Sequence, residues 1–425
     1  MTSATDLAEP LPARLTRERF GDAFLFLTVA CSSIVMFEPA PYDLFLALHA
    51  VIAFALGLRM PRTMAPLVVL MLLYDVGGIL SLTQVTYWEP ENPYIFVAIS
   101  ALMVVDAVFL AATTADRPHR IAVVLQATAA AAVLAAVLGI LGWVAKIDAL
   151  TLYGRAKGTF KDPNVYGPFL VLPLIWLVHR MLTHSFVRAW SKAVPAGLIL
   201  IALLLSFSRA AWGMAAGALV LIYLVVFIAE RDTRRRLRLI GIAVGAVLGL
   251  ALLFALALSF EEVRTMFFER AKLTQSYDSA RLGRFARHWI GFLWATELPL
   301  GIGPYQFGHH FPEDPHNVYL KSLMTYGWLG FLAYVTLALW TLGKLFPLMF
   351  KPRPWQAAAQ CVWVVLFVHQ VASWIIDSDH WRHFFLLWGL AWGMIALEAG
   401  WQRRMRGAGA EAGPRAPEFA QARRI

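Results

Sequence analysis

Long apolar runs separated by short polar segments fill the sequence from residue 22 onward. Each run approaches the roughly 20 residues that a helix needs to cross a ~30 Å hydrocarbon core. The runs occupy residues 22–37, 42–58, 64–82, 94–113, 121–145, 164–184, 194–208, 211–229, 239–260, 317–343, 356–376 and 383–398. The first two and the seventh are short, so the pattern predicts an all-α polytopic membrane protein with about 12 transmembrane helices.

Composition supports the membrane assignment. Apolar residues make up 59% of the chain, charged residues only 15%, and the mean hydropathy is +0.62. Soluble domains are nearer half apolar and a quarter charged. Cys31 and Cys361 both fall inside predicted spans and indicate neither a disulfide framework nor a metal site. The net charge of +10 does not indicate nucleic-acid binding, because that inference needs a basic face on a soluble module.

Most of the 37 Lys and Arg residues lie in every second connecting segment. The acidic outer turns near 38–43 and 84–94 contain none. This positive-inside pattern predicts cytoplasmic tails at 1–20 and 401–425, around a single transmembrane domain at 21–400. It places the long segment 261–316 on the outer side, where it is expected to contain amphipathic helices. The predicted inner cations between the tails are Arg59, Arg62, Arg117, Arg120, Arg180, Arg188, Lys192, Arg231, Arg234, Arg235, Arg236, Arg238, Lys344, Lys351 and Arg353.

The long outer segment ends in Asp-Pro-His-Asn, residues 314–317, just before an apolar run. Asp314 is predicted to be a helix N-cap with Pro315 at the first helical position, which sets His316 in the first turn. The positive end of the helix dipole disfavours imidazolium there, so His316 is expected to stay neutral and able to accept a proton. The alternative is a polar capping residue that faces water.

Below His316, four residues lie 4, 7, 11 and 14 positions further on and are predicted to form one stripe of the helix. They are Leu320, Leu323, Gly327 and Gly330. The two glycines would allow another backbone to approach closely.

Three groups of basic residues break the positive-inside pattern on the outer side. Arg155 and Lys161 lie in a loop made flexible by Gly158, before a predicted helix start where phosphate oxygens can bind. The alternative is an ordinary interfacial loop with snorkelling side chains. Arg209 is the single charged residue between Pro195 and Ile228. A central intramembrane charge costs roughly 2.5–3.5 kcal/mol, which favours a functional role over an arginine that merely marks a tight outer turn.

The third group lies in the middle of the long segment. Basic residues recur there at helical spacing, and apolar residues form the opposite stripe: Arg281, Arg284 and His288 against Phe285, Trp289, Phe292 and Leu293. This pattern predicts an amphipathic helix in the outer interface with its apolar side toward the membrane. Its arginines can bind phosphate oxygens in bidentate fashion, for a substrate or, alternatively, for anionic headgroups.

Other polar residues are weaker candidates. Three of them lie within predicted spans: Asp75, Asp106 and Lys321. They could relay protons or, alternatively, make polar contacts between helices. A second set, His309, His310, Glu313 and Asp314, matches no common metal-binding spacing, so no metal site is predicted. The sequence also contains no Walker loop, no serine nucleophile elbow and no HExxH motif.

Taken in order, several short motifs resemble the O-antigen ligase and polymerase superfamily of bacterial envelope enzymes. The most specific is His316-Asn317, nine residues, then Gly327-Trp328-Leu329-Gly330, a pattern associated with the ligases. The others are Gly-Thr-Phe-Lys-Asp-Pro-Asn at 158–164, Phe-Ser-Arg at 207–209, and Arg284 followed by Pro-Leu-Gly-Ile-Gly-Pro at 299–304. Together they cover roughly residues 150–330.

This resemblance implies a metal-independent, cofactor-free glycosyltransferase in the bacterial inner membrane, with its site facing the periplasm. The donor would be a glycan on undecaprenyl pyrophosphate. By matched position, His316 would be the base or the residue that orients the acceptor, and Arg209 and Arg284 would bind the pyrophosphate. Arg155, Lys161, Arg281 and Asn317 are further candidates for substrate binding.

Three functions remain open at this point. A ligase would join the glycan to an acceptor hydroxyl of lipid A-core, whereas an O-antigen or exopolysaccharide polymerase would add it to a growing glycan. We favour the ligase. A small-anion transporter built around Arg209 and the intramembrane acids is the third possibility, but it predicts broken helices and internal symmetry, and no internal repeat is visible.

Overall fold

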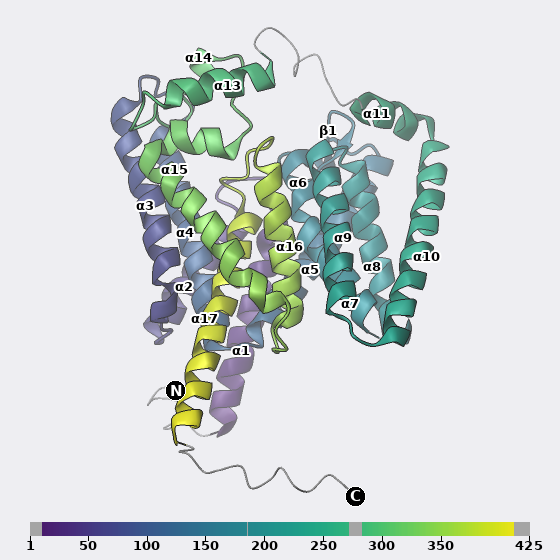
Figure 1. Ribbon diagram of the computed structural model, residues 1–425. Coiled ribbons are helices and arrows are strands. Elements are labelled where there is room, and N and C mark those ends of the chain that lie inside the picture. Colours follow the sequence, from purple (N-terminus) through teal and green to yellow (C-terminus); the bar gives the residue numbers. More distant parts are fainter. Residues whose placement is uncertain (1–10, 185, 272–282, 412–425) are drawn as a thin grey trace, which may run out of the picture.

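The computed structural model describes residues 11–184, 186–271 and 283–411, which fold almost entirely into helices (Figure 1). Its α-helices are α1 Leu11–Ala30, α2 Pro41–Ala55, α3 Ala65–Ser81, α4 Pro93–Asp116, α5 Arg120–Val144, α6 Pro163–Phe169, α7 Val171–Thr183, α8 Phe186–Leu205, α9 Arg209–Ala229, α10 Thr233–Leu258, α11 Glu261–Ala271, α13 Arg284–Ala295, α14 Phe307–His310, α15 Val318–Leu345, α16 Gln356–Ala372 and α17 Arg382–Glu411. Short 3-10 turns include η2 Arg62–Met64 and η5 Phe346–Met349. The strands β1 Thr151–Leu152 and β2 Arg155–Ala156 form a small antiparallel hairpin.

Each of the twelve apolar runs overlaps a helix or, for 164–184, the consecutive helices α6 and α7, although the run 22–37 leaves α1 at Ala30. Within the described residues, eight helices are long and apolar enough to cross a membrane. Three shorter apolar helices lie at Pro41–Ala55, Ser191–Leu205 and Gln356–Ala372. The all-α polytopic fold is therefore confirmed, while a total of twelve crossings stays a prediction.

Small residues let the spans approach one another closely. A Cβ added to Gly77 of α3 would lie 2.4 Å from the carbonyl oxygen of Tyr326 in α15. On α17, a Cβ at Gly389 would lie 2.9 Å from the carbonyl oxygen of Ala107 in α4. Helices in lipid gain stability mainly from such close contact, because apolar side chains find equally apolar surroundings in the acyl chains.

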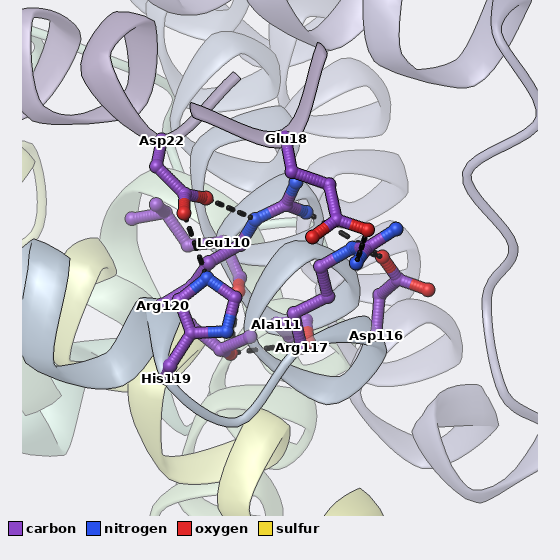
Figure 2. A network of polar contacts seen from close by, with 9 residues as sticks. Glu18, Asp22, Leu110, Ala111, Asp116, Arg117, His119 and Arg120 are labelled. Atoms are coloured by element: carbon purple, nitrogen blue, oxygen red, sulfur yellow. Dashed lines mark hydrogen bonds and ion pairs between the residues drawn. The ribbon is translucent and has the colours of Figure 1, made fainter. Parts of the chain in front are cut away.

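The two ends of the helical bundle differ. The start of α1 and the end of α17 lie at one of them, and α11, α13 and α14 lie at the other (Figure 1). We call the first the inner end and the second the outer end, following the charge pattern. At the inner end α1 is tied to the turn between α4 and α5 (Figure 2). There Glu18 contacts Arg117 at 2.6 Å, and Asp22 contacts Arg120 at 3.0 Å and His119 at 2.7 Å.

Candidate functional site

The helix that follows His316 begins later than its sequence predicts. Asn317, not Asp314, is the N-cap of α15: its Oδ1 accepts hydrogen bonds from the backbone N–H of Tyr319 at 3.0 Å and of Leu320 at 3.1 Å. His316 has a φ of +47°, in the left-handed region, so it cannot be part of the right-handed helix. The expected helical start at Asp314 and Pro315 is therefore wrong. A non-glycine residue held in this region costs about 1–3 kcal/mol and is found most often at functional sites.

Two hydrogen bonds tie this corner to the loop between α16 and α17. The backbone N–H of Val318 donates to the carbonyl of Ser373 at 2.8 Å. The imidazole Nδ1 of His316 lies 3.0 Å from Oδ2 of Asp377, and the His316 side chain keeps 43% of its surface exposed. The structure thus pairs an accessible histidine with a carboxylate that lies 61 residues away in the sequence.

This carboxylate reverses the expected charge preference of His316. The hydrogen bond to Asp377 raises the pKa of His316, against the opposing effects of burial and of the Arg284 charge. Burial alone would raise the pKa of Asp377, but Lys321 and His316 outweigh it and hold that pKa below its usual value. A helix terminus was expected to disfavour imidazolium at His316, but His316 lies outside the helix and beside an anion, so its pKa is raised and not lowered. With the Nδ1 proton shared with Asp377, Nε2 is the nitrogen left to accept a proton.

A buried ion pair lies one helical turn below. Lys321 Nζ contacts Asp379 Oδ1 at 3.1 Å, and Asp314 and Asp377 also interact electrostatically with this lysine. The pair is almost enclosed, with 16% of the Lys321 side chain and 3% of that of Asp379 exposed. Lys321, one of the weaker candidates from the sequence, is thus linked to His316 through Asp377.

The intramembrane acids make contacts between helices. Asp75 of α3 accepts a hydrogen bond from Ser100 of α4 at 2.8 Å, and Asp106 of α4 accepts one from Tyr42 of α2 at 2.8 Å. These bonds favour the second of the two roles considered for Asp75 and Asp106, polar contact between neighbouring spans.

Arg284 opens α13 and lies close enough to His316 and Asp377 for its charge to act on both. Helix α13 rests on the start of α15: a Cβ at Gly291 would lie 2.8 Å from Leu320, and the Trp328 indole donates to the carbonyl of Ala295 at 2.9 Å. The structure therefore brings the Arg284 end of α13 to the His316–Asp377 pair.

The two faces of α13 have different surroundings. His288 is buried, and one of its ring nitrogens hydrogen-bonds to the carbonyl of Pro315. Arg287 is also buried and forms an ion pair with Glu313, with 2.9 Å between Nη2 and Oε2. The opposite stripe is exposed, with Phe285 at 59% and Trp289 at 68% of their surfaces. His288, expected on the basic side of this amphipathic helix, is buried because Pro315 and its neighbours cover it. Arg281 lies outside the described residues.

Arg209 is the first residue of α9 and follows Phe207, whose φ of +46° makes a tight turn. Helix α9 runs along α16, where a Cβ at Gly217 would lie 3.6 Å from Val368. Because α16 leads into the loop that holds Asp377, the Arg209 end of α9 lies at the outer end of the bundle with His316 (Figure 1). Helix α11 covers this end, with Phe267 stacked on Trp212 at 5.5 Å between ring centroids.

Residues 194–335 match the family model Wzy_C, described as O-Antigen ligase. This stretch, about a third of the chain, is similar to O-antigen ligases. No curated protein matches the chain. The matched range includes Arg209, Arg284 and His316, and the resemblance to the superfamily is confirmed there. The family comprises glycosyltransferase-like ligases and polymerases, and the described residues contain eight helices that could span a membrane, which is compatible with a multi-pass membrane protein of that kind.

Asp377 lies outside the part of the chain that matches the O-antigen ligase domain, and sequence reasoning missed it. It sits in the short outer turn between the last two spans, 373–381, which also contains Asp379 and His380. A concentration of acids and a histidine in a short turn opposite His316 was the available signal. Spacing alone could not pair residues so far apart.

Arg155, Lys161 and Asn317 have structural partners around the O-antigen ligase domain. Arg155 is buried in the β1–β2 hairpin and donates to the Ser206 carbonyl and to Asn164 Oδ1, each at 2.8 Å. The loop expected to be flexible is thus ordered at this point. Lys161 is half exposed and pairs with Glu38 at 3.1 Å. Asn317 is buried and uses its Oδ1 as the cap of α15.

The glycines of the ligase signature shape the corner beneath His316. Gly327 has a φ of +65° and kinks α15, so the expected single straight stripe is wrong. The kink admits the segment 299–303: the N–H of Trp328 donates to the carbonyl of Pro299 at 3.0 Å, and a Cβ at Gly327 would lie 2.6 Å from that oxygen. The predicted close approach of another backbone at this glycine is confirmed.

The described residues contain no group of three or more His, Cys, Asp or Glu that could hold a metal ion. His309 stacks on Tyr87 with 4.1 Å between ring centroids, and His310 meets Trp294 edge-on at 4.9 Å. Both histidines therefore contribute aromatic contacts at the outer end.

Proposed function

We propose that this protein is a ligase that transfers a glycan from undecaprenyl pyrophosphate to an acceptor hydroxyl of lipid A-core at the periplasmic face. The observation that supports it best is the contact of an accessible His316 with Asp377, with Arg284 beside the pair. Arg209 lies at the same end of the bundle (Figure 1). A general base and cations for a departing pyrophosphate are the groups that this transfer requires.

In the proposed reaction His316 acts as the base. Its Nδ1–H donates to Asp377, and Nε2 takes the proton of the acceptor hydroxyl as that oxygen attacks the anomeric carbon of the donor glycan. One C–O bond forms at this carbon, and its bond to the phosphate oxygen breaks. Undecaprenyl pyrophosphate leaves with the electron pair and is stabilised by Arg284 and Arg209, which can bind phosphate oxygens in bidentate fashion.

The raised pKa of His316 fits this role. Because its pKa is raised, the imidazole of His316 is a stronger base than a free histidine side chain. The same shift increases the protonated, inactive fraction at a given pH, so the acid side of the pH profile should report the pKa of His316. Asp377 also holds the ring in one orientation, which a flexible surface histidine would lack.

The position of α13 suits substrates whose head groups lie at a membrane surface. Its exposed stripe of Phe285, Trp289 and Leu293 forms an apolar strip next to the Arg284 end. Aromatic and aliphatic side chains on one face of a short helix favour the membrane interface. With this stripe in the outer leaflet, Arg284 would lie at the depth of the phosphates of a lipid-linked donor.

A reconstituted transfer assay tests the proposal. Purified protein receives a lipid-linked oligosaccharide with and without lipid A-core, in the presence of EDTA, and His316→Ala serves as the inactive control. Glycan joined to lipid A-core supports the ligase. Chain lengthening alone replaces it with the polymerase, and anion flux in liposomes without any transfer replaces it with the transporter.

A further inference from the structure

The inner end, far from His316, contains a cavity of about 410 Å³ between the start of α3, the end of α15 with η5, and α17. Ligand pockets in proteins have volumes of about 300–1,000 Å³. We call this cavity the inner pocket. The residues of its wall used below are Trp340, Lys344, Lys351, Trp392, Glu398 and Gln402.

Hydrogen bonds hold the walls of the inner pocket in place. The indole of Trp392 donates to Thr341 Oγ1 at 2.9 Å, which joins α17 to α15. The carbonyl of Met349, at the end of η5, accepts from Gln356 at 3.0 Å and from Gln360 at 2.9 Å. A cavity built on such fixed elements needs little ordering when a ligand binds, which favours affinity.

The charges around the inner pocket leave an excess of positive charge. Its single lining acid, Glu398, is buried and accepts from Lys351 and Arg353 at 3.0 Å each and from Gln402 at 2.9 Å. Lys344 lines the pocket and makes no ion pair or hydrogen bond within the described part of the chain. Lys351 and Arg353 neutralise Glu398, and Lys344 adds a further positive charge to the pocket wall, so the surroundings of the pocket favour an anion.

The surface next to the inner pocket is apolar. Trp340 exposes 41% of its surface, and Phe346 and Phe350 are also exposed beside Lys344 and Lys351. Trp340, Lys344 and Phe346 lie in the last third of the candidate span Val318–Met349, and Phe350 and Lys351 follow it directly. A ligand that uses both surfaces must carry a negative head group and apolar chains. Basic pockets between spans at the cytoplasmic side are where anionic lipid head groups bind.

We propose that the inner pocket binds the head group of an anionic glycerophospholipid of the inner leaflet, with its acyl chains along Trp340 and Phe346. The phosphate lies at Lys344 and Lys351, where charge-assisted hydrogen bonds can form. This site is independent of the transfer reaction at the outer end. A soluble phosphate compound shares the phosphate chemistry but lacks the chains, and the test separates the two.

The full-length protein in detergent is titrated with dioleoyl phosphatidylglycerol, dioleoyl phosphatidylcholine, or glycerol 3-phosphate, and its thermal unfolding midpoint and lipid retention by native mass spectrometry are measured. Phosphatidylglycerol should raise the midpoint at concentrations where the other two do not. Lys344→Glu should weaken its apparent affinity about tenfold, the loss of about one charge-assisted contact. Ala399→Phe, which fills the cavity without changing charge, should remove retention.

Arg234→Glu is the matched control, because Arg234 is an exposed cation in the first turn of α10 at the same end of the bundle. Equal effects of the two lipids, an equal shift with glycerol 3-phosphate, or equal losses in Lys344→Glu and Arg234→Glu would each overturn the proposal. If Ala399→Phe does not fold, Lys344→Glu and its control decide the result.

Discussion

The two ends of this bundle use charge in different ways. At the inner end, Arg117 and Arg120 each meet an acid of α1 and also contact Asp116, in a partly exposed network where the α1 contacts join side chains that are 15–25% exposed (Figure 2). At the outer end, Lys321 and Asp379 form an almost enclosed pair, and Asp377 and Asp314 also act on that lysine. The inner charges join neighbouring helices at the surface, whereas the outer charges form one buried cluster below an accessible histidine.

This difference shows which charges to test for function. Partly exposed ion pairs contribute little to stability, about 0–1 kcal/mol, and many positions satisfy the positive-inside pattern equally well. Burying charges has a high desolvation cost, and ionisable groups within membrane spans usually serve a function. The outer cluster is therefore where substitutions should be felt most.

The largest effect is expected at His316. His316→Ala removes the proposed base and should lower glycan transfer by about 10²–10⁴-fold, the usual contribution of general acid–base catalysis. Transfer is measured with purified protein at equal amounts of folded enzyme. His309→Ala, an exposed histidine at the same end, is the control and should keep full activity. Near-normal turnover of His316→Ala would remove the base from the mechanism.

Arg284→Ala and Arg209→Ala should each lower transfer by about 10²–10³-fold, the effect of losing one group that stabilises developing negative charge. The lysine variants should recover only part of the activity, because lysine cannot bind phosphate in bidentate fashion. Arg264→Ala, an exposed residue of α11 paired with Glu261, is the matched control. Full activity in Arg209→Ala would show that this arginine only completes the turn after Phe207.

Lys321→Met should reduce stability by about 3–5 kcal/mol, because it leaves Asp379 and its acidic neighbours buried without their cation. The measurement is the midpoint of thermal unfolding in detergent. Lys321→Met combined with Asp379→Leu removes the pair together and should regain most of the loss. A single variant as stable as the parent protein would show that the outer cluster is no more costly than the inner pairs.

Sequence reasoning found the helical elements and the family resemblance. The apolar runs predicted the spans because a helix in lipid must satisfy all its backbone groups internally, which leaves few alternatives. The motifs around Arg209, Arg284 and His316 identified the family that matches residues 194–335. These features depend on composition and local order, which a single chain displays directly.

Other features depend on contacts that no local pattern encodes. Asp314 and Asn317 are both good N-caps, and the hydrogen bond from Val318 to Ser373 lies beside the cap that is used. The pairing of His316 with Asp377 follows from that contact. The kink at Gly327 likewise depends on the segment 299–303 that fills it. Each of these features was missed because its cause lies in a distant part of the chain.

Asp377→Asn should have a smaller effect on rate, about tenfold to a hundredfold, as for other residues that orient a functional histidine. Its signature is in the pH profile. The Asp377 carboxylate stabilises imidazolium and raises the pKa of His316, so its removal lowers that pKa. The acid limb of transfer should therefore move to lower pH. Glu313→Gln, an acid paired with Arg287, should leave the limb in place. A limb that stays or moves upward in Asp377→Asn would contradict the assignment.

The smallest effect is expected at the inner end. Arg117→Ala breaks the contact with Glu18, which is about one quarter exposed on each side, so it should cost at most about 1 kcal/mol of stability. Salt screens exposed pairs, so the difference between Arg117→Ala and the parent protein should shrink further between low and high ionic strength. Unfolding midpoints at both ionic strengths measure this. A loss that exceeds about 1 kcal/mol and does not respond to salt would mean that the inner network is as strongly coupled as the outer cluster. The two ends would then not differ in how strongly their charged side chains interact.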